Sequence, residues 1–263
     1  MTAKRILVLI PHPDDEVVGC AAAIRRAAAA GARVFGLYLT TGVPPAELLW
    51  RQQRRHHPMR VIVRRLEARD AAAALGLEPV GFAERPARRL RAELGAALGE
   101  IEAALSRVRA DELWVSAWEG GHQDHDAANF LAARCAGRVP VLEYAEYNNS
   151  AGVRSQAFAA TTGAEIVLRL DREEQAEKRR LLAFYRSERR NLAHVERTQE
   201  SLRPLPAHDY AAPPHPGTLF AERFHWVPFR HPRIDFERHE TLRAALADFA
   251  RGSGGQQDPP QRQ

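Results

Sequence analysis

The sequence predicts an α/β fold: a Rossmann-like, doubly wound and mostly parallel sheet with helices on both faces, plus a smaller C-terminal extension. Two observations support this. Short apolar runs such as RILVLI, residues 5–10, are typical of strands covered on both faces. Alanine-rich helical segments alternate with such runs over about the first 150 residues, which is the order of a doubly wound domain.

The first strand, residues 5–10, leads through the polar stretch PHPDDE into a helix. Asp14 or Asp15 is a suitable N-cap for this helix, and Gly31 is a suitable C-terminal residue. RVFGLYLTTG, residues 33–42, is predicted to be the second strand followed by a loop. A strand, helix and strand in this order favour parallel pairing.

The alternation continues with further helices and strands. Helices are predicted over residues 64–77, 93–108 and 124–138, and strands over 78–82, 111–118 and 139–145. We expect one domain in two parts, a Rossmann-like catalytic core over 1–150 and a C-terminal part over 151–250 that completes the sheet and the rim of the site. The second part shows a strand at 163–170, a helix at 171–190 and a proline-rich loop at 203–217, and residues 251–263 are predicted to be a disordered tail.

Composition excludes several classes of protein. The net charge of +5 is almost entirely due to arginine, scattered among glutamates without a nucleic-acid-binding module, so we expect no nucleic-acid partner. No apolar run approaches the roughly 20 residues of a membrane span, and no signal peptide is recognisable, so a cytoplasmic protein without a membrane partner is expected. Cys20 and Cys135 lie in alanine-rich helical patterns and are predicted to be buried free thiols.

Two polar clusters follow predicted core strands. PHPDDE places His12 and Asp15 three residues apart, and EGGHQDHD does the same for His122 and His125. The carboxyl ends of parallel strands converge at one edge of the sheet, where ligands bind. Two imidazoles and a carboxylate are suitable ligands for Zn²⁺ in an open catalytic site, with Fe²⁺ as the alternative. Asp14, one residue out of the ligand register, is placed to act as a general base.

A single His-Pro-Asp-Asp turn is more often a helix N-cap than a pair of metal ligands. Two such clusters at the ends of strands of one sheet favour a metal site.

The same residues carry a resemblance to a known family. PHPDDEVVG resembles the P/A-H-P-D-D-E signature, and GGHQDHDAA the H-x-D-H signature, of the PIG-L (LmbE-like) N-acetylglucosaminyl deacetylases, metal-dependent amide hydrolases on a Rossmann-like fold. The resemblance extends over about residues 4–150 and includes LTTG and the helix RRLEARDAAAALG. It implies that the metal, usually zinc, is held by His12, Asp15 and His125.

The resemblance also implies roles for the neighbouring residues. Asp14 would be the general base, and His122 would stabilise the oxyanion or protonate the leaving amine. Asp124 would orient His122, and Arg64 is similar to a family arginine that contacts the substrate. Amide hydrolysis needs a strong nucleophile, an anion stabiliser and an acid, which this set can supply.

The sequence departs from the family pattern at two places. Some members carry a tyrosine where this chain has Gly120, and Tyr144 or Tyr147 could replace it from the next strand. An aspartate that often follows the third strand is missing, and Glu84 is the nearest carboxylate. Both changes concern regions that contact the substrate, so they leave its identity open.

The function predicted from the sequence is a zinc-dependent hydrolase that deacetylates an N-acetylated amino sugar or a sugar-bearing small molecule. Two alternatives stay open: a metal-dependent esterase or amidase acting on another small acylated substrate, and a non-catalytic sugar- or nucleotide-binding module. The dinucleotide fingerprint G-x-G-x-x-G is absent after the first strand, which disfavours a nucleotide-binding module. The oligomeric state, including a homo-oligomer, is left open.

Overall fold

A seven-stranded sheet forms the centre of the protein. The computed structural model describes residues 4–224, 226–227, 231 and 234–253. The strand order is β3-β2-β1-β4-β5-β9-β8; the strands from β3 to β5 are parallel, and β9 is antiparallel to both β5 and β8. The bounds are β1 Arg5–Ile10, β2 Arg33–Tyr38, β3 Leu77–Phe82, β4 Glu112–Ser116, β5 Val141–Tyr144, β8 Ile166–Arg169 and β9 Gln199–Pro204; a separate ribbon pairs β6 Tyr147–Asn148 with β7 Arg154–Ser155. The predicted α/β fold with a mostly parallel sheet is confirmed.

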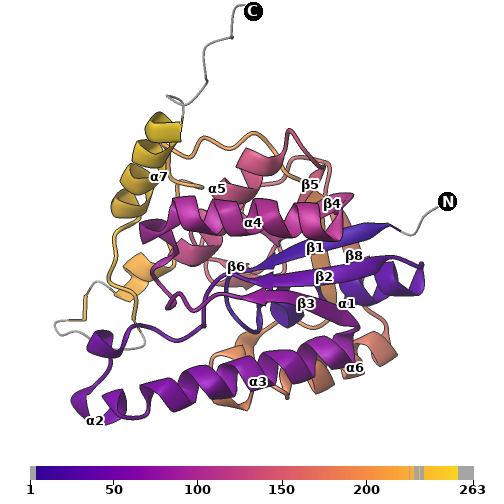
Figure 1. Ribbon diagram of the computed structural model, residues 1–263, viewed down its shortest axis with the longest axis horizontal. Helices are drawn as coiled ribbons and strands as arrows, with labels where there is room; N and C mark the ends of the chain where they lie inside the picture. Colours follow the sequence, from indigo (N-terminus) through magenta and orange to yellow (C-terminus); the bar gives the residue numbers. More distant parts are fainter. Residues whose placement is uncertain (1–3, 225, 228–230, 232–233, 254–263) are drawn as a thin grey trace, which may run out of the picture.

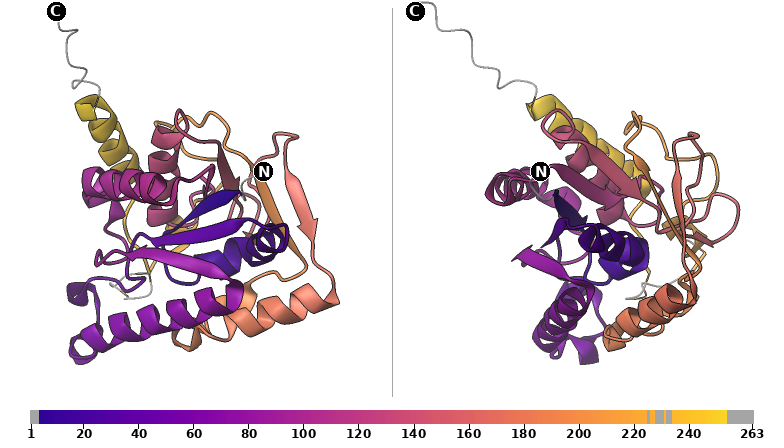
Figure 2. Two further views of the ribbon diagram at one scale, coloured as in Figure 1. Left: turned by 45° about the vertical axis from the view of Figure 1, so that its right-hand side comes forward. Right: turned by 90° about the vertical axis from the view of Figure 1, so that its right-hand side faces the viewer.

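Helices cover both faces of the sheet (Figures 1 and 2). Their bounds are α1 Asp15–Ala29, α2 Arg51–Arg54, α3 His57–Leu75, α4 Leu94–Val108, α5 Gln123–Cys135, α6 Arg172–Leu182 and α7 His239–Ser253. Short 3-10 turns lie at Ala46–Leu48, Leu90–Ala92, Arg186–Glu188, Leu192–His194 and Ala221–Phe224.

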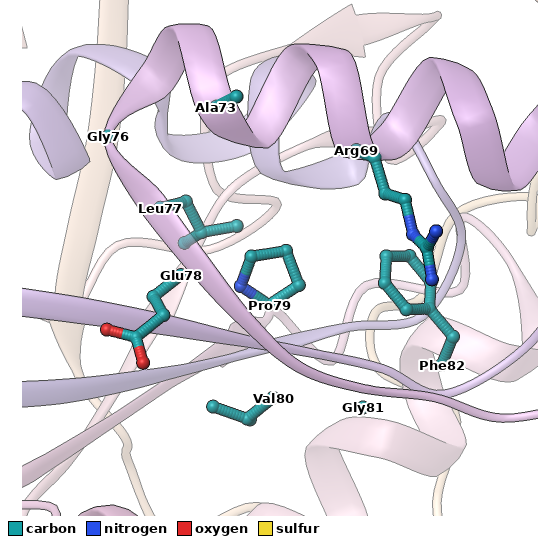
Figure 3. Close-up of a pocket in the computed structure, with 9 residues that line it drawn as sticks. All are labelled: Arg69, Ala73, Gly76, Leu77, Glu78, Pro79, Val80, Gly81 and Phe82. Atoms are coloured by element: carbon teal, nitrogen blue, oxygen red, sulfur yellow. The ribbon is translucent and has the colours of Figure 1, made fainter.

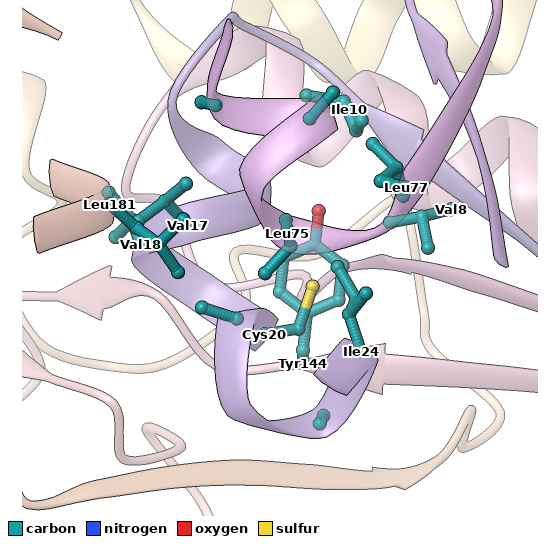
Figure 4. Close-up of a cluster of buried hydrophobic side chains, with 14 of the residues drawn as sticks. Val8, Ile10, Val17, Val18, Cys20, Ile24, Leu75, Leu77, Tyr144 and Leu181 are labelled. Atoms are coloured by element: carbon teal, nitrogen blue, oxygen red, sulfur yellow. The ribbon is translucent and has the colours of Figure 1, made fainter. Parts of the chain in front are cut away.

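The side chains of β1 explain why both faces are covered. Val8 and Ile10 point to the layer formed by α1, α3 and α6, whereas Leu7 and Leu9 point to the layer formed by α4, α5 and α7. Figure 4 shows part of the first layer, with Tyr144 among its apolar side chains. Because a strand alternates its side chains between two faces, an uninterrupted apolar run requires a core on each side.

The chain reverses its direction of travel across the sheet next to β1. It proceeds from β1 to β2 and β3 on one side, then returns to β4 and β5 on the other, and β1 is hydrogen-bonded to both β2 and β4. The carboxyl ends of β1 and β4 therefore flank a topological switch point, where open α/β sheets bind ligands. PHPDDE and EGGHQDHD are the segments that leave these two strands.

Helix α1 starts at this switch point, a few residues after the end of β1. Asp14 occupies the N-cap position, but its carboxylate makes no capping hydrogen bond, so the simple capping explanation for this aspartate does not hold. Gly19 is needed one turn later, because a Cβ there would lie 2.3 Å from the Tyr144 ring. Helix α1 can therefore pack closely against β5 only because residue 19 is a glycine.

Several element boundaries differ from the prediction. Helix α3 begins at His57, before the predicted start at residue 64, and Pro58 at its first turn has the φ that a helix start requires. Helix α6 ends at Leu182 instead of extending to residue 190. The turn that follows carries the buried Tyr185 to the carboxylate of Glu16, which accepts a hydrogen bond from its hydroxyl.

Two elements of the C-terminal part were not predicted. Strand β9 extends the sheet, and α7 covers it with the buried Leu242 and Leu246. Helix α7 continues through Ser253, so the first three residues of the expected disordered tail are helical, while 254–263 lie outside the described residues. Both cysteines are free and buried, as predicted. Within the described ranges, no helix combines the length and the apolar character that a membrane span requires.

A surface hollow lies beside the edge strand β3 and the end of α3 (Figure 3). Arg69 and Glu78 are its charged residues, and neither motif contributes to its lining. The residues that line the hollow include no cluster of catalytic groups.

Candidate functional site

Three side chains from the two motifs meet at the switch point. Nδ1 of His12 lies 3.1 Å from Nε2 of His125 and 3.3 Å from Oδ2 of Asp15, and the third pair, Nε2 of His125 and Oδ2 of Asp15, is 3.2 Å apart. His12 comes from the loop after β1, Asp15 from the first residue of α1, and His125 from the first turn of α5. We call these three atoms the ligand triangle.

The ligand triangle has the size that a tetrahedral metal ion requires. Zinc bonds to nitrogen and oxygen of roughly 2.0–2.1 Å place neighbouring tetrahedral ligands about 3.3–3.4 Å apart. The three sides measured here are 3.1–3.3 Å. The donor set and the spacing therefore fit a small divalent cation without rearrangement of the backbone.

A carboxylate lies behind each imidazole of the triangle. Nε2 of His12 lies 2.9 Å from Oδ2 of Asp124, and Nδ1 of His125 lies 3.5 Å from Oε2 of Glu146. Metal-binding histidines usually direct their second ring nitrogen to such a partner, which fixes the tautomer and the ring orientation. Both histidines therefore have the surroundings of metal ligands.

The charges of the triangle are strongly coupled. Burial opposes a positive charge on His12, but Asp15 and Asp124 outweigh it and raise the pKa of His12 to about 10. Burial would by itself raise the pKa of Asp15, but His125 and His12 hold it well below its ordinary range. Burial, followed by the nearby Asp15, raises the pKa of Glu146 well above its ordinary range. This concentration of buried carboxylates favours a cation among them.

Asp14 is held beside the triangle in a strained conformation. Its φ of 117° is unusual for a residue with a side chain and is typical of functional sites. Nη1 and Nη2 of Arg64 lie 3.2 and 3.3 Å from Oδ2 of Asp14. Burial raises the pKa of Asp14 to about 7, with Arg64 opposing and Asp15 adding to the rise. The carboxyl group can therefore both take and release a proton near neutral pH.

Three further hydrogen bonds support the loop that carries Asp14. Glu16 accepts a hydrogen bond from the Asp14 amide at 3.2 Å and another from the hydroxyl of Tyr185. Arg64 also donates to the carbonyl of Pro13. The loop is therefore fixed from both α3 and the segment after α6.

His122 has a defined proton arrangement. Its Nδ1 accepts a hydrogen bond from the Asp124 amide at 3.0 Å, so in the neutral imidazole the proton is on Nε2. Burial and the neighbouring His12 lower the pKa of His122 well below its ordinary value, which keeps the ring neutral. Its ring centroid lies 4.4 Å from that of His12, and 18% of the side chain is exposed. His122 can therefore donate a hydrogen bond to a bound molecule.

Two side-chain contacts in the structure, those of Asp124 and Arg64, differ from the expected ones. Oδ2 of Asp124 lies 2.9 Å from His12 but 3.8 Å from Nδ1 of His122, so its carboxylate orients His12 instead of His122. Arg64 was expected to contact the substrate, but only 4% of its side chain is exposed, and its guanidinium faces Asp14 and Glu188. Its position suits an effect on Asp14.

The structure also separates the two tyrosines that were considered as replacements at position 120. Tyr144 is buried in the core and donates to the Leu9 carbonyl at 3.0 Å, whereas the Tyr147 ring centroid lies 5.5 Å from that of His125. At Gly120, φ is 64° and a Cβ would lie 2.6 Å from the Leu219 side chain, so this position cannot easily carry a tyrosine. Tyr147 is the tyrosine beside the site.

Of two carboxylates near the ends of strands, Glu84, which the sequence analysis named, lies away from the site, whereas Glu146, which it did not consider, lies beside it. Glu84 is exposed and forms an ion pair with Arg65, away from the triangle. Glu146 follows β5, the next strand of the sheet after β4, and is 2% exposed. The strand-end rule that singled out the two motifs would also have singled out Glu146 had it been applied to residues 139–145.

The comparisons with known proteins give a family match for about the first half of the chain. Residues 7–136 match the family model described as PIG-L, GlcNAc-PI de-N-acetylase. No curated protein matches the sequence.

Solved structures are similar in fold. The zinc-inhibited form of teicoplanin deacetylase Orf2 is 18% identical with a TM-score of 0.58, covering 76% of this chain and 97% of that one. N,N'-diacetylchitobiose deacetylase from Pyrococcus horikoshii is 18% identical with a TM-score of 0.56, covering 86% and 88%. The 4-carboxy-2-hydroxymuconate hydratase from Pseudomonas putida KT2440 is 17% identical with a TM-score of 0.55, covering 78% and 98%.

These likenesses show the fold, which also occurs in a hydratase, so the family assignment depends on the sequence match. That match begins within β1 and ends just beyond α5, so it includes both motifs. Residues 7–136 are therefore a PIG-L domain, similar to the domain of the family described as GlcNAc-PI de-N-acetylase.

Proposed function

We propose that this protein is a zinc-dependent hydrolase that removes the acetyl group from an N-acetylated amino sugar or a sugar-bearing small molecule. The observation that carries the proposal is the ligand triangle, with Asp14 and His122 beside it. The family match and the deacetylases among the similar structures support the N-deacetylase reaction.

In this proposal His12, Asp15 and His125 hold the ion. When bound, a divalent ion supplies the Lewis acidity that lowers the pKa of a water molecule and polarises a carbonyl group. Two nitrogen ligands and one oxygen ligand suit zinc and leave Fe²⁺ as the alternative. One similar structure is the zinc-inhibited form of a deacetylase, so activity should be measured over a range of zinc concentrations.

Asp14 acts as the general base in this scheme. It takes a proton from the attacking water, because its pKa of about 7 makes the carboxylate available at neutral pH. Its carboxylate makes no capping hydrogen bond to α1, and its contacts with Arg64 are through Oδ2. The protonated Asp14 can then return the proton to the nitrogen of the departing amine as the C–N bond breaks.

His122 acts as a hydrogen-bond donor. Its Nδ1 is occupied by the Asp124 amide, so Nε2–H is the group available to the oxygen of the tetrahedral intermediate. A fixed donor aimed at developing negative charge is among the largest contributions an active site can make. Of the two roles open for His122, the neutral ring favours oxyanion stabilisation over protonation of the amine.

Tyr147 is the residue we assign to the substrate side of the site. It lies against His125, and Gly121 allows the close approach, because a Cβ there would lie 3.2 Å from the Tyr147 ring. We infer that Tyr147 takes the position that a tyrosine at residue 120 would occupy in other members of the family.

The test is a screen for acetate release from N-acetylated and O-acetylated forms of the same sugars, including disaccharides and glycoconjugates. We expect release from N-acetylated substrates and a decrease in kcat of about 10²- to 10⁴-fold for Asp14→Asn. Acetate release only from the O-acetylated forms would replace the amidase proposal with the esterase alternative. Absence of release from every substrate at all zinc and iron concentrations would contradict both.

A further inference from the structure

Glu146 is a buried carboxylate next to His125 of the ligand triangle. Its residue is 2% exposed, and neither side-chain oxygen has a hydrogen-bond partner among the described residues. A buried carboxylate without a donor is unfavourable, so such a group usually serves a particular purpose. Glu146 lies outside residues 7–136, so the family match assigns it no role.

The surroundings of Glu146 direct its side chain toward the triangle. Its backbone carbonyl accepts from the Gln156 amide at 2.8 Å, which fixes the main chain after β5. On the other side, a Cβ at Gly19 would lie 3.1 Å from Cγ of Glu146, so α1 packs closely against it. Two ionisable side chains lie beside it: Nδ1 of His125, at 3.5 Å from Oε2, and the carboxylate of Asp15.

Glu119, another buried glutamate, has the hydrogen-bond partners that Glu146 lacks. Glu119 is also buried, at 3% exposure, but its Oε1 accepts from Nδ2 of Asn148 at 3.1 Å and from the Ala159 amide at 2.8 Å. Glu119 is therefore satisfied by groups outside the site. Among the described residues Glu146 has no such partners, and Nδ1 of His125 is a potential donor 3.5 Å from its Oε2.

We propose that Glu146 is a positioning residue for the metal site, which accepts the Nδ1–H of His125 and thereby turns the Nε2 lone pair toward the ion. The proposal rests on the ligand assignment of the proposed function. It parallels the contact of Asp124 with Nε2 of His12, so each histidine of the triangle has its own carboxylate.

One alternative is that Glu146 binds the ion directly. Asp15, His125 and Glu146 offer ligand atoms within 4.8 Å of one another. The geometry favours the positioning role, because Glu146 faces Nδ1 of His125 whereas the triangle uses Nε2. The two roles predict different effects of replacing Glu146 with glutamine, whose side-chain oxygen can still accept the hydrogen bond.

The experiment measures Zn²⁺ affinity of the metal-free full-length protein by competition with a chromogenic chelator at fixed pH. Glu146→Leu keeps the volume but removes the acceptor, and we expect zinc to bind about 10- to 100-fold more weakly. Glu146→Gln should recover most of this loss. The matched control is Glu119→Gln, which keeps both hydrogen bonds to Oε1 and should bind zinc as the unsubstituted protein does.

Two further readouts separate positioning from a general effect on folding. The Tm of the metal-free Glu146→Leu variant should be at least as high as that of the unsubstituted metal-free protein, because the substitution removes an unpaired buried carboxylate. The visible spectrum of the Co²⁺-loaded protein should change in Glu146→Leu and resemble the original in Glu146→Gln.

Each outcome bears on the proposal. Unchanged zinc affinity and cobalt spectrum in Glu146→Leu would overturn it. A loss in Glu146→Gln as large as that in His125→Ala would make Glu146 a direct ligand and would also overturn it. If the unsubstituted protein binds no metal, the proposed function fails as well; if it binds metal and only the Glu146 variants behave otherwise than expected, the proposed function stands.

Discussion

Nε2 of His12 lies 2.9 Å from Oδ2 of Asp124, a residue 112 positions later in the chain. Asp124 also accepts from the backbone amides of Arg88 and Leu90, at 2.5 and 3.1 Å. One buried carboxylate thus joins the loop after β1, the segment after β3 and the first turn of α5. The position of His12 in the ligand triangle depends on this junction.

Replacing Asp124 with asparagine should therefore weaken metal binding. An amide cannot accept from His12 and both backbone donors without directing its NH₂ group at one of them. We expect a decrease of about 10- to 100-fold in zinc affinity, measured by chelator competition. Asp126→Asn is the control, since Asp126 is equally buried but bonds to the Glu119 and Gly120 amides. Equal affinities for both variants would show that Asp124 does not orient His12.

Replacing Arg64 with glutamine should lower kcat and leave KM unchanged. The guanidinium contacts Asp14 and is too deeply buried to contact a substrate. Its loss should therefore affect the orientation and the charge of Asp14, the proposed general base. Misplacement of a catalytic group costs about 100-fold in rate. The control is Arg65→Gln, which removes a partly exposed ion pair with Glu84. An increase in KM at constant kcat would instead support the substrate contact implied by the family resemblance.

Replacing Gly19 with alanine should destabilise the fold. The added methyl group would lie 2.3 Å from the Tyr144 ring and 3.1 Å from Glu146. Such overpacking costs about 1–3 kcal/mol of unfolding free energy, which denaturant titration can measure. Gly99→Ala is a matched change in α4 with open space around it, and should stabilise the protein by about 0.5–1 kcal/mol. Similar effects in both variants would contradict the close packing of α1 on β5.

Replacing Glu119 with glutamine should change how stability depends on pH. Burial raises the pKa of Glu119 from 4.5 to about 8, so the folded chain retains a proton that the unfolded chain loses. The contribution of Glu119 to stability therefore falls as pH rises between these two values, by about 1.4 kcal/mol per pH unit. The variant lacks this titration, so its stability relative to the original protein should increase from about pH 5 to 8. Parallel stability curves would contradict a protonated Glu119.

The sequence was informative where local patterns determine structure. The apolar run of β1 and the alternation up to β5 depend on side-chain periodicity, which a single sequence displays. The convergence of the two motifs could be predicted because both lie at the ends of parallel strands, whereas the choice of His125 as a ligand came from the family resemblance.

Other features depend on packing between distant segments, which a pattern does not display. Asp124 bonds to His12 instead of His122, and Arg64 is buried against Asp14, because of how α5 and α3 pack on the loop after β1. Helix α7 and strand β9 gain stability from covering and extending an existing sheet. Glu146 acquires its role only when β5 lies beside β4 and brings it to His125.

The most direct test of the account is the metal content of the purified protein, measured by elemental analysis together with acetate release before and after chelation. We predict about one equivalent of zinc or iron per chain, loss of acetate release on removal of the ion, and recovery when it is restored. Less than about a tenth of an equivalent of any transition metal, with no gain of activity when zinc or iron is added, would contradict it.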